Sequence, residues 1–276
     1  LVDSWPVGAA AAAVLGADTG GRTVLLDRVG DEERVFDWAS LTKLLVALAV
    51  LVAVEEETLA LDAPAGPPGS TVRHLLAHAS GLGPDGPTPL SAPGRRRIYS
   101  SVGYEILADT LAQAAGLPFA GYLSGGVLTP LSMSGTELPP GASPASGARG
   151  TLADLLALAV EALVPRLVSR PTQDLATRVA FPGLAGVLPG YGHFDPCDWG
   201  LGFEVKGAKA PHWTGTRTAP ATFGHFGRAG GFLWVDPTRR LACAALGDRD
   251  FGPWAVDAWT RLADAVVEEW APTVVG

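Results

Sequence analysis

The chain is poor in the residues that characterise several classes of protein. Its two cysteines, Cys197 and Cys243, cannot form a disulfide framework, and the sequence leaves open whether they pair or stay reduced. The net charge is −8, and the only basic cluster is three arginines at 95–97, a pattern typical of a solvated loop. Because no basic stripe is available to neutralise phosphates, we exclude nucleic acid as a partner.

Long hydrophobic runs are also missing. The longest, from Leu44 to Val54, is much shorter than the roughly 20 residues that span a bilayer. No basic segment followed by an apolar stretch marks a signal peptide, although the chain begins at Leu1 and not at Met. With 47% hydrophobic and 17% charged residues the composition is that of a globular protein, for which we expect a cytoplasmic location and no membrane span.

Lysine is scarce as well, and one of the three lysines stands in an unfavourable place. Lys43 opens the apolar run, which must be buried if it is a helix. Burial and the positive end of the helix dipole both disfavour the ammonium and lower its pKa. Ser40, three residues earlier, shares its face, and a hydroxyl beside a desolvated amine can become a nucleophile. The alternative is that Ser40 is only a helix N-cap, although a capping box would need Glu or Gln where Lys43 stands.

The remaining pattern predicts an α+β fold, in which strands at both ends of the chain form one antiparallel sheet flanked by helices. We expect a single domain, 1–276, made of a sheet subdomain (1–39 plus 186–276) and a mainly helical inserted subdomain (40–185). The expected strands are 9–17, 21–29, 199–206, 222–226, 231–235 and 241–246. The expected helices follow Ser40 and cover 71–78, 103–115, 151–163 and 253–270.

Two further motifs follow Ser40-x-x-Lys43 along the chain. Tyr99-Ser100-Ser101 precedes a helical pattern, and His225-Phe226-Gly227 lies on a predicted strand. In this order the motifs resemble those of the serine β-lactamase and penicillin-binding-protein superfamily, and most closely its class C-like branch, which also holds esterases and D-aminopeptidases. The resemblance extends from about residue 7 to residue 270 and implies the β-lactamase/transpeptidase-like fold.

The resemblance implies a role for each matching residue. Ser40 corresponds to the acyl-accepting nucleophile, with Lys43 and Tyr99 as its general base; we expect the lysine to lower the pKa of the tyrosine. His225 and Gly227 match the Lys/His-x-Gly motif of the strand that lines the site. The backbone N–H groups of Ser40 and Arg228 would form the oxyanion hole. Without the resemblance, Tyr99 could be an ordinary half-buried tyrosine and His225 an ordinary strand histidine.

One position departs from the family pattern. Ser101 stands where the family has an asparagine that binds the substrate's acylamino group, and a serine offers one hydroxyl instead of an amide. The departure favours an esterase- or amidase-like enzyme over a true β-lactamase. Phe226, Trp213 and Tyr191 are further candidates for substrate contact.

We therefore expect a serine hydrolase that forms an acyl-enzyme on Ser40 with small ester or amide substrates. Two alternatives stay open: an acyltransferase that uses the same acyl-enzyme, and a non-catalytic ligand-binding protein. The chemistry needs no metal or organic cofactor, and His74 and His78, four residues apart, lack an evident third metal ligand. The sequence does not determine the physiological substrate or the oligomeric state.

Overall fold

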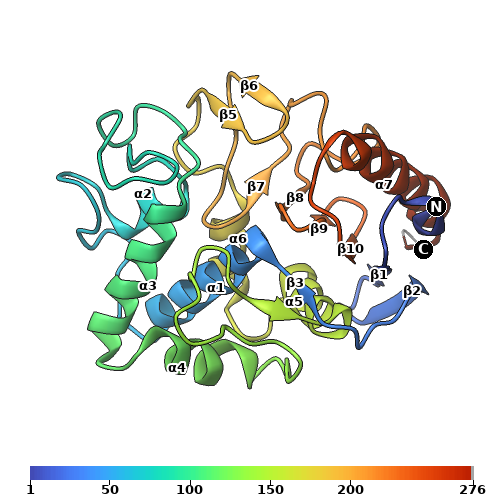
Figure 1. Cartoon of the computed structure of the whole chain (residues 1–276), viewed down its shortest axis with the longest axis horizontal. Helices are drawn as coiled ribbons and strands as arrows, with labels where there is room; N and C mark the ends of the chain where they lie inside the picture. Colours follow the sequence, from blue (N-terminus) through green and yellow to red (C-terminus); the bar gives the residue numbers. More distant parts are fainter. Residues whose placement is uncertain (275–276) are drawn as a thin grey trace.

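Strands from both ends of the chain form the central sheet. The computed structural model describes residues 1–274, with the side chains of residues 1–271. All six strands are antiparallel to their neighbours and come from both ends of the chain, as predicted, and the first strand lies beside the last (Figure 1). In spatial order the strands are β2 (Thr23–Val29), β1 (Ala10–Ala17), β10 (Leu241–Gly247), β9 (Gly231–Asp236), β8 (Phe223–Gly227) and β7 (Glu204–Val205).

The two faces of the sheet carry separate hydrophobic cores. Strand β1 shows this by alternation, because Ala11 and Ala13 join one core whereas Ala12 and Val14 join the other. Helix α5 (Leu152–Leu163) packs on the first face, and helix α7 (Pro253–Val274) covers the second. A strand that is buried on both sides loses the polar alternation of a half-exposed strand, which explains the run of alanines in β1.

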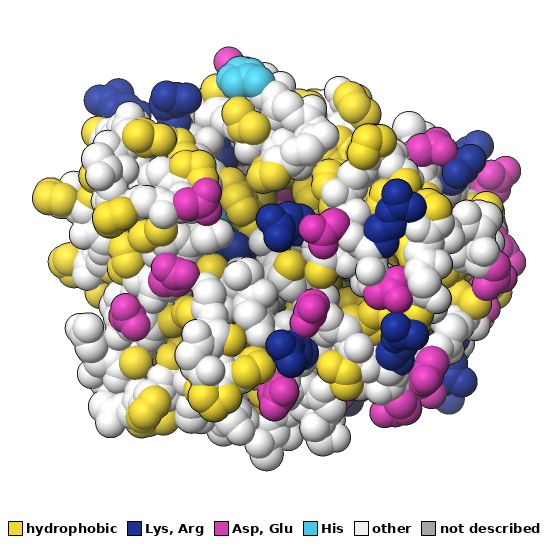
Figure 2. All heavy atoms as spheres, in the orientation of Figure 1, with side chains coloured by type: hydrophobic (Ala, Val, Ile, Leu, Met, Phe, Trp, Pro, Cys, Tyr) yellow, Lys and Arg dark blue, Asp and Glu magenta, His cyan; other side chains and the backbone are white. Residues whose placement is uncertain are grey.

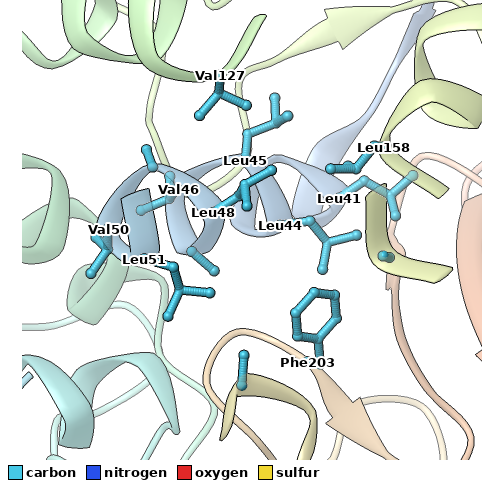
Figure 3. Close-up of a cluster of buried hydrophobic side chains, with 14 of the residues drawn as sticks. Leu41, Leu44, Leu45, Val46, Leu48, Val50, Leu51, Val127, Leu158 and Phe203 are labelled. Atoms are coloured by element: carbon cyan, nitrogen blue, oxygen red, sulfur yellow. The ribbon is translucent and has the colours of Figure 1, made fainter. Parts of the chain in front are cut away.

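Helix α1 (Thr42–Glu55) passes through the larger core. All its residues from 42 to 53 are buried, as the uninterrupted apolar sequence predicts. Figure 3 shows its leucines and valines pointing to all sides, with Val127 on one flank and Phe203 on the other. A short 3-10 turn, η2 (Ala39–Leu41), leads into the helix and brings Ser40 to its N-terminal end.

Further short elements surround this centre. The expected helices 103–115, 151–163 and 253–270 are confirmed with small shifts at their ends, whereas η1, α4, η3, α6 and the two strand pairs were not predicted. These elements are η1 (Val2–Ser4), α2 (Val72–Leu76), α3 (Ser101–Ala115), α4 (Phe119–Leu123), the π-helical η3 (Ser124–Leu128), α6 (Arg170–Thr177), the pair β3 (Phe36–Asp37) and β4 (Arg149–Gly150), and the pair β5 (Gly186–Leu188) and β6 (Gly192–Phe194).

The predicted strand 199–206 is wrong over most of its length. Only Glu204–Val205 pairs in the sheet, because the preceding residues fold against α6 instead. Leu201 donates its backbone N–H to Ala176, and Gly202 has a φ of 96°, which breaks an extended strand. Helix 71–78 is likewise shorter than predicted: it ends at Leu76. The proposed division into a sheet and a helical subdomain stays a prediction, and α5 from the inserted part packs directly on the sheet.

The structure bears on two questions raised by the composition: the state of the cysteines and the presence of a membrane-spanning helix. Both cysteines, Cys197 and Cys243, are buried and unpaired, so the chain has no disulfide between them. Among the helices of residues 1–274, none is long and apolar enough to cross a membrane.

Candidate active site

Ser40 lies where η2 meets α1, on the wall of a cavity of about 460 Å³. The preceding residue, Ala39, has a φ of 45°, an unfavourable conformation for a residue with a Cβ. Strain of this kind is often found at functional sites, where the surrounding structure maintains it. Figure 2 shows a hollow near the middle of this face, at the level where α1 begins in Figure 1, with hydrophobic side chains inside it and charged ones at its rim.

Lys43 approaches Ser40 from the protein interior. Its Nζ lies 3.2 Å from Ser40 Oγ, donates to the carbonyl of Ala145 at 2.8 Å, and lies 3.5 Å from Ser101 Oγ. Burial lowers the pKa of this lysine to about 7, although the negative charges of Glu105 and Asp85 oppose the shift. None of the ion pairs among the described residues includes Lys43. A large fraction of the amine is therefore neutral near pH 7 and can accept a proton.

Tyr99 contacts the same hydroxyl from the cavity side. Its Oη donates to Ser40 Oγ at 2.7 Å, and Lys43 Nζ lies 4.8 Å from the centre of its ring. The expected lowering of the pKa of Tyr99 is wrong: burial raises it, and the hydrogen bond with Ser40 only partly offsets the effect. A neighbour that is itself largely uncharged has little power to stabilise a phenolate. Tyr99 is thus an O–H donor to Ser40 Oγ, and Lys43 is the stronger candidate for a base.

His78 supports Tyr99 from behind, a contact that the sequence did not predict. Its ring centroid lies 4.6 Å from that of Tyr99 and 4.8 Å from that of Trp199. Its Nδ1 accepts the backbone N–H of Ser100 at 3.1 Å, which fixes the chain next to the tyrosine. His78 is therefore engaged in packing and backbone contacts within the site.

His225 on β8 forms another wall of the cavity. Its Nδ1 lies 2.8 Å from the carbonyl of Phe226, so this nitrogen carries the proton and donates it. Burial, assisted by the nearby Lys43, lowers the pKa of His225 to about 3, and the ring is neutral. Its centroid lies 5.9 Å from that of Tyr99, which brings the third motif into contact with the second.

Gly227 lets the end of β8 approach Ser40 closely. A Cβ at this position would clash with the carbonyl oxygen of Trp38 and would lie 3.4 Å from the backbone nitrogen of Ser40. Neither the N–H of Ser40 nor that of Arg228 donates to another residue within the described chain. These two N–H groups remain the candidates for the predicted oxyanion hole.

The other expected contact residues divide into two groups. Ser101, Phe226 and Arg228 line the cavity. Trp213 and Tyr191 do not: Trp213 is fully buried and donates its Nε1–H to Glu204 Oε2 at 3.0 Å, and the ring of Tyr191 packs edge-on behind Phe226.

Sequence reasoning missed several residues that line the cavity, and Glu204 is the most unexpected of them. Its carboxylate is buried, 2.7 Å from Lys209 Nζ and 2.8 Å from His212 Nε2. Burial by itself would raise the pKa of Glu204, but His212 and Lys209 outweigh it and hold the value at about 2. The signal available in the sequence was Lys209, another lysine that stands among small and apolar residues. The other missed lining residues are Pro84, Asp85, Leu188, Pro189, Gly190, Trp199 and Phe251.

Comparisons with known proteins identify the family of this chain. The family model Beta-lactamase matches residues 8–268. A β-lactamase from Mycobacterium bovis is 50% identical over 98% of both chains, with a TM-score of 0.93. No curated protein sequence matches significantly.

More distant solved structures share the fold. EstCE1, a hydrolase with promiscuous acyltransferase activity, is 19% identical over 95% of this chain and 94% of its own, with a TM-score of 0.73. A β-lactamase/D-alanine carboxypeptidase from Yersinia pestis is 18% identical over 96% and 97%, with a TM-score of 0.70. The match of the family model over nearly the whole chain, together with the 50% identity to the M. bovis protein, decides the assignment. This chain belongs to the beta-lactamase family.

Proposed function

We propose that the protein is a serine hydrolase that forms an acyl-enzyme on Ser40 and acts on small esters or amides. The observation that carries the proposal is the contact of one hydroxyl with two complementary groups. Ser40 Oγ lies 3.2 Å from a lysine whose pKa is about 7 and accepts a hydrogen bond of 2.7 Å from Tyr99. A base and an acid on the same nucleophile are what acyl transfer at neutral pH needs.

The reaction follows from these positions. Neutral Lys43 takes the proton of Ser40 while Oγ attacks the substrate carbonyl, and the N–H groups of Ser40 and Arg228 stabilise the oxyanion. Tyr99, whose side chain lines the cavity, gives its proton to the leaving group and regains one from Lys43. The net result is transfer of the serine proton to the leaving group, and water later reverses the sequence to release the acid.

Esters are the favoured substrates. Ser101 presents one hydroxyl where the family pattern has an amide, and that hydroxyl lies 3.5 Å from Lys43 Nζ. The walls opposite it are largely apolar, with Leu188, Phe226 and Phe251. Such a cavity suits an uncharged acyl group better than a peptide-like side chain that needs paired hydrogen bonds. The M. bovis protein is a β-lactamase, and β-lactams are therefore the substrates to compare with esters.

Intact-protein mass spectrometry tests the proposal. The protein is incubated separately with p-nitrophenyl acetate, a penicillin and a cephalosporin, alongside the Ser40→Ala variant. We expect an acetyl adduct or turnover with the ester, absent from the variant. Adducts from the β-lactams as well would extend the substrate range to penicillins. An unreactive protein with all three would contradict the hydrolase proposal and favour a non-catalytic ligand-binding protein.

An acyltransferase is the second candidate, because the apolar walls leave few polar groups to bind the attacking water. EstCE1, which shares the fold, is a hydrolase with promiscuous acyltransferase activity. Product analysis with an added alcohol separates the two: a transferase gives a new ester in preference to the free acid.

A further inference from the structure

A second cavity lies directly beside the catalytic one. Its volume is about 360 Å³, and it shares Pro84, Tyr99 and Pro189 with the cavity that contains Ser40. Tyr99 is therefore a wall of both spaces. A molecule bound at Ser40 that extends past this side chain enters the second cavity.

The walls of this second cavity are unusually apolar for an exposed region. Leu90 and Val187 line it, and they are 62% and 53% exposed, among the most exposed large hydrophobic residues of the protein. Ile98 and the two shared prolines complete the apolar surface. Exposed apolar groups gathered around a hollow mark a binding surface more often than single exposed residues do.

Two chain segments hold these walls in place. The backbone N–H of Arg97 donates to Ala185 at 2.9 Å, and Arg97 forms a parallel bridge with Gly186 at the start of β5. A Cβ on Gly186 would clash with the Arg97 carbonyl, so only glycine allows the two segments to approach this closely. The cavity is thus formed by backbone pairing between parts of the chain that are far apart in sequence.

The rim of the second cavity is basic. Arg96 lines it and is exposed, and no ion pair within the described part of the chain involves this residue. His193 is the other titratable group at the rim, and no acidic side chain is among the lining residues. The guanidinium of Arg97 is directed inward to the carbonyls of Ala77, Cys197 and Ala180 and cannot reach a ligand. Arg96 is therefore the charge that a bound molecule meets.

The chemistry at Ser40 determines which part of a substrate reaches this cavity. In acylation the Ser40 Oγ–carbon bond forms, the carbon–oxygen bond of the ester breaks, and the proton of Ser40 ends on the departing oxygen. That proton is delivered by Tyr99, the only O–H group that both lines the cavity and contacts Ser40 Oγ in the described chain. The leaving group must lie against Tyr99, and the second cavity begins there.

We propose that the second cavity is the leaving-group subsite and that it selects esters of alcohols with an apolar body and an anionic end. The inference rests on the proposed serine-hydrolase function. The apolar walls take the body of the alcohol, and Arg96 attracts its charge.

Two aryl acetates of matched shape test the charge selection. 4-Acetoxyphenylacetate carries a carboxylate, whereas 4-acetoxyphenylacetamide is neutral, and both give the same acetyl-enzyme. We expect kcat/KM to favour the anionic ester, and we expect Arg96→Glu to shift the ratio of the two values by about tenfold toward the neutral one. Arg95→Glu is the matched control, because Arg95 is also exposed but does not line the cavity.

A second variant tests the apolar walls. Val187→Trp should lower the acylation rate with both aryl acetates by about fivefold through steric filling, while the deacylation rate of the shared acetyl-enzyme stays unchanged. Val24→Trp is the control, because Val24 is 46% exposed on the sheet edge and outside both cavities.

The outcomes separate the two proposals. An acetyl adduct on Ser40 with an unchanged ester ratio in Arg96→Glu would overturn the subsite and leave the hydrolase function intact. A Val187→Trp effect on deacylation would also overturn it, because the cavity would then hold the acyl group. The lack of any Ser40 adduct with either ester would overturn both.

Discussion

All three lysines of the protein are buried, and the partners of two of them, Lys43 and Lys209, differ in one respect. Lys209 lies 2.7 Å from the carboxylate of Glu204 and 3.0 Å from the carbonyl of Asp198. Lys43 has only neutral oxygens within hydrogen-bond distance: the Ala145 carbonyl and the hydroxyls of Ser40 and Ser101. A carboxylate offsets the cost of burying an ammonium, whereas burial without a carboxylate partner lowers the pKa of a lysine, as it does for Lys43. The presence of a carboxylate thus distinguishes the surroundings of Lys209 from those of Lys43.

Replacing Lys43 should affect activity most. We expect Lys43→Met to lower acylation of Ser40 by at least about a thousandfold, because no other base contacts the hydroxyl. The free energy of unfolding should stay the same or rise, since a poorly solvated amine is exchanged for an apolar side chain of similar length. Esterase kinetics and chemical denaturation measure the two effects. A variant with a lower free energy of unfolding but unchanged esterase activity would mean that Lys43 supports the fold and is not the base.

Replacing Lys209 should affect stability instead. Lys209→Met leaves a buried carboxylate without its ammonium partner, which costs about 3–5 kcal/mol of unfolding free energy. The double variant Glu204→Gln/Lys209→Met removes both charges and should recover most of that loss. Urea unfolding of the three proteins gives the values. A loss below about 1 kcal/mol, the range of a surface pair, would mean that Lys209 is not a structural ion-pair partner.

Removing the hydroxyl of Tyr99 tests the acid side of the same centre. Tyr99→Phe keeps the ring contacts with His78 and Trp199 but removes the donor to Ser40 Oγ. We expect acylation to fall by about a hundredfold, within the range typical of general acid–base groups. Esters with better leaving groups should lose less, because they need less protonation. Equal losses across a leaving-group series would argue that Tyr99 does not protonate the departing oxygen.

Ser101 should have the smallest effect. Its hydroxyl lies 3.5 Å from Lys43 Nζ, a long contact compared with the 2.8 Å bond to Ala145. Ser101→Ala should change kcat/KM for small esters by only about twofold to threefold, near the value of a weak neutral hydrogen bond. A drop of a hundredfold in p-nitrophenyl acetate hydrolysis would show instead that Ser101 belongs to the proton-transfer centre.

Local sequence was sufficient to place Ser40 and Lys43 in contact at the start of a buried helix. The apolar run after Lys43 predicts a buried helix whatever surrounds it, and the i,i+3 spacing places Ser40 beside the lysine. The antiparallel sheet formed by strands from both ends of the chain is also confirmed. It could be predicted because β1 and β10 each carry a strong strand pattern. Features encoded in the period of one element can be deduced without knowledge of its partners.

Features that depend on distant contacts could not be deduced. The direction of the pKa shift of Tyr99 is set by burial among residues from several elements, and the sequence argument used only its proximity to a lysine. The first part of the predicted strand 199–206 is absent because the backbone N–H of Leu201 donates to the carbonyl of Ala176 instead of pairing in the sheet. The second cavity exists because Arg97 pairs with Gly186, 89 positions further along the chain. The periodicity of hydrophobic residues within one element does not reveal which distant segments of the chain will pair.

The pH dependence of Ser40 acylation tests the central claim, that Lys43 is a neutral base, most directly. The burst of p-nitrophenol from p-nitrophenyl acetate is followed between about pH 5 and 9 in the wild type and in Lys43→Met. Because the base must be deprotonated, the rate should rise about tenfold per pH unit at low pH and level off above an apparent pKa of about 7, and this limb should vanish in the variant. A limb that continues to rise to pH 9, or the same profile in both proteins, would contradict the account.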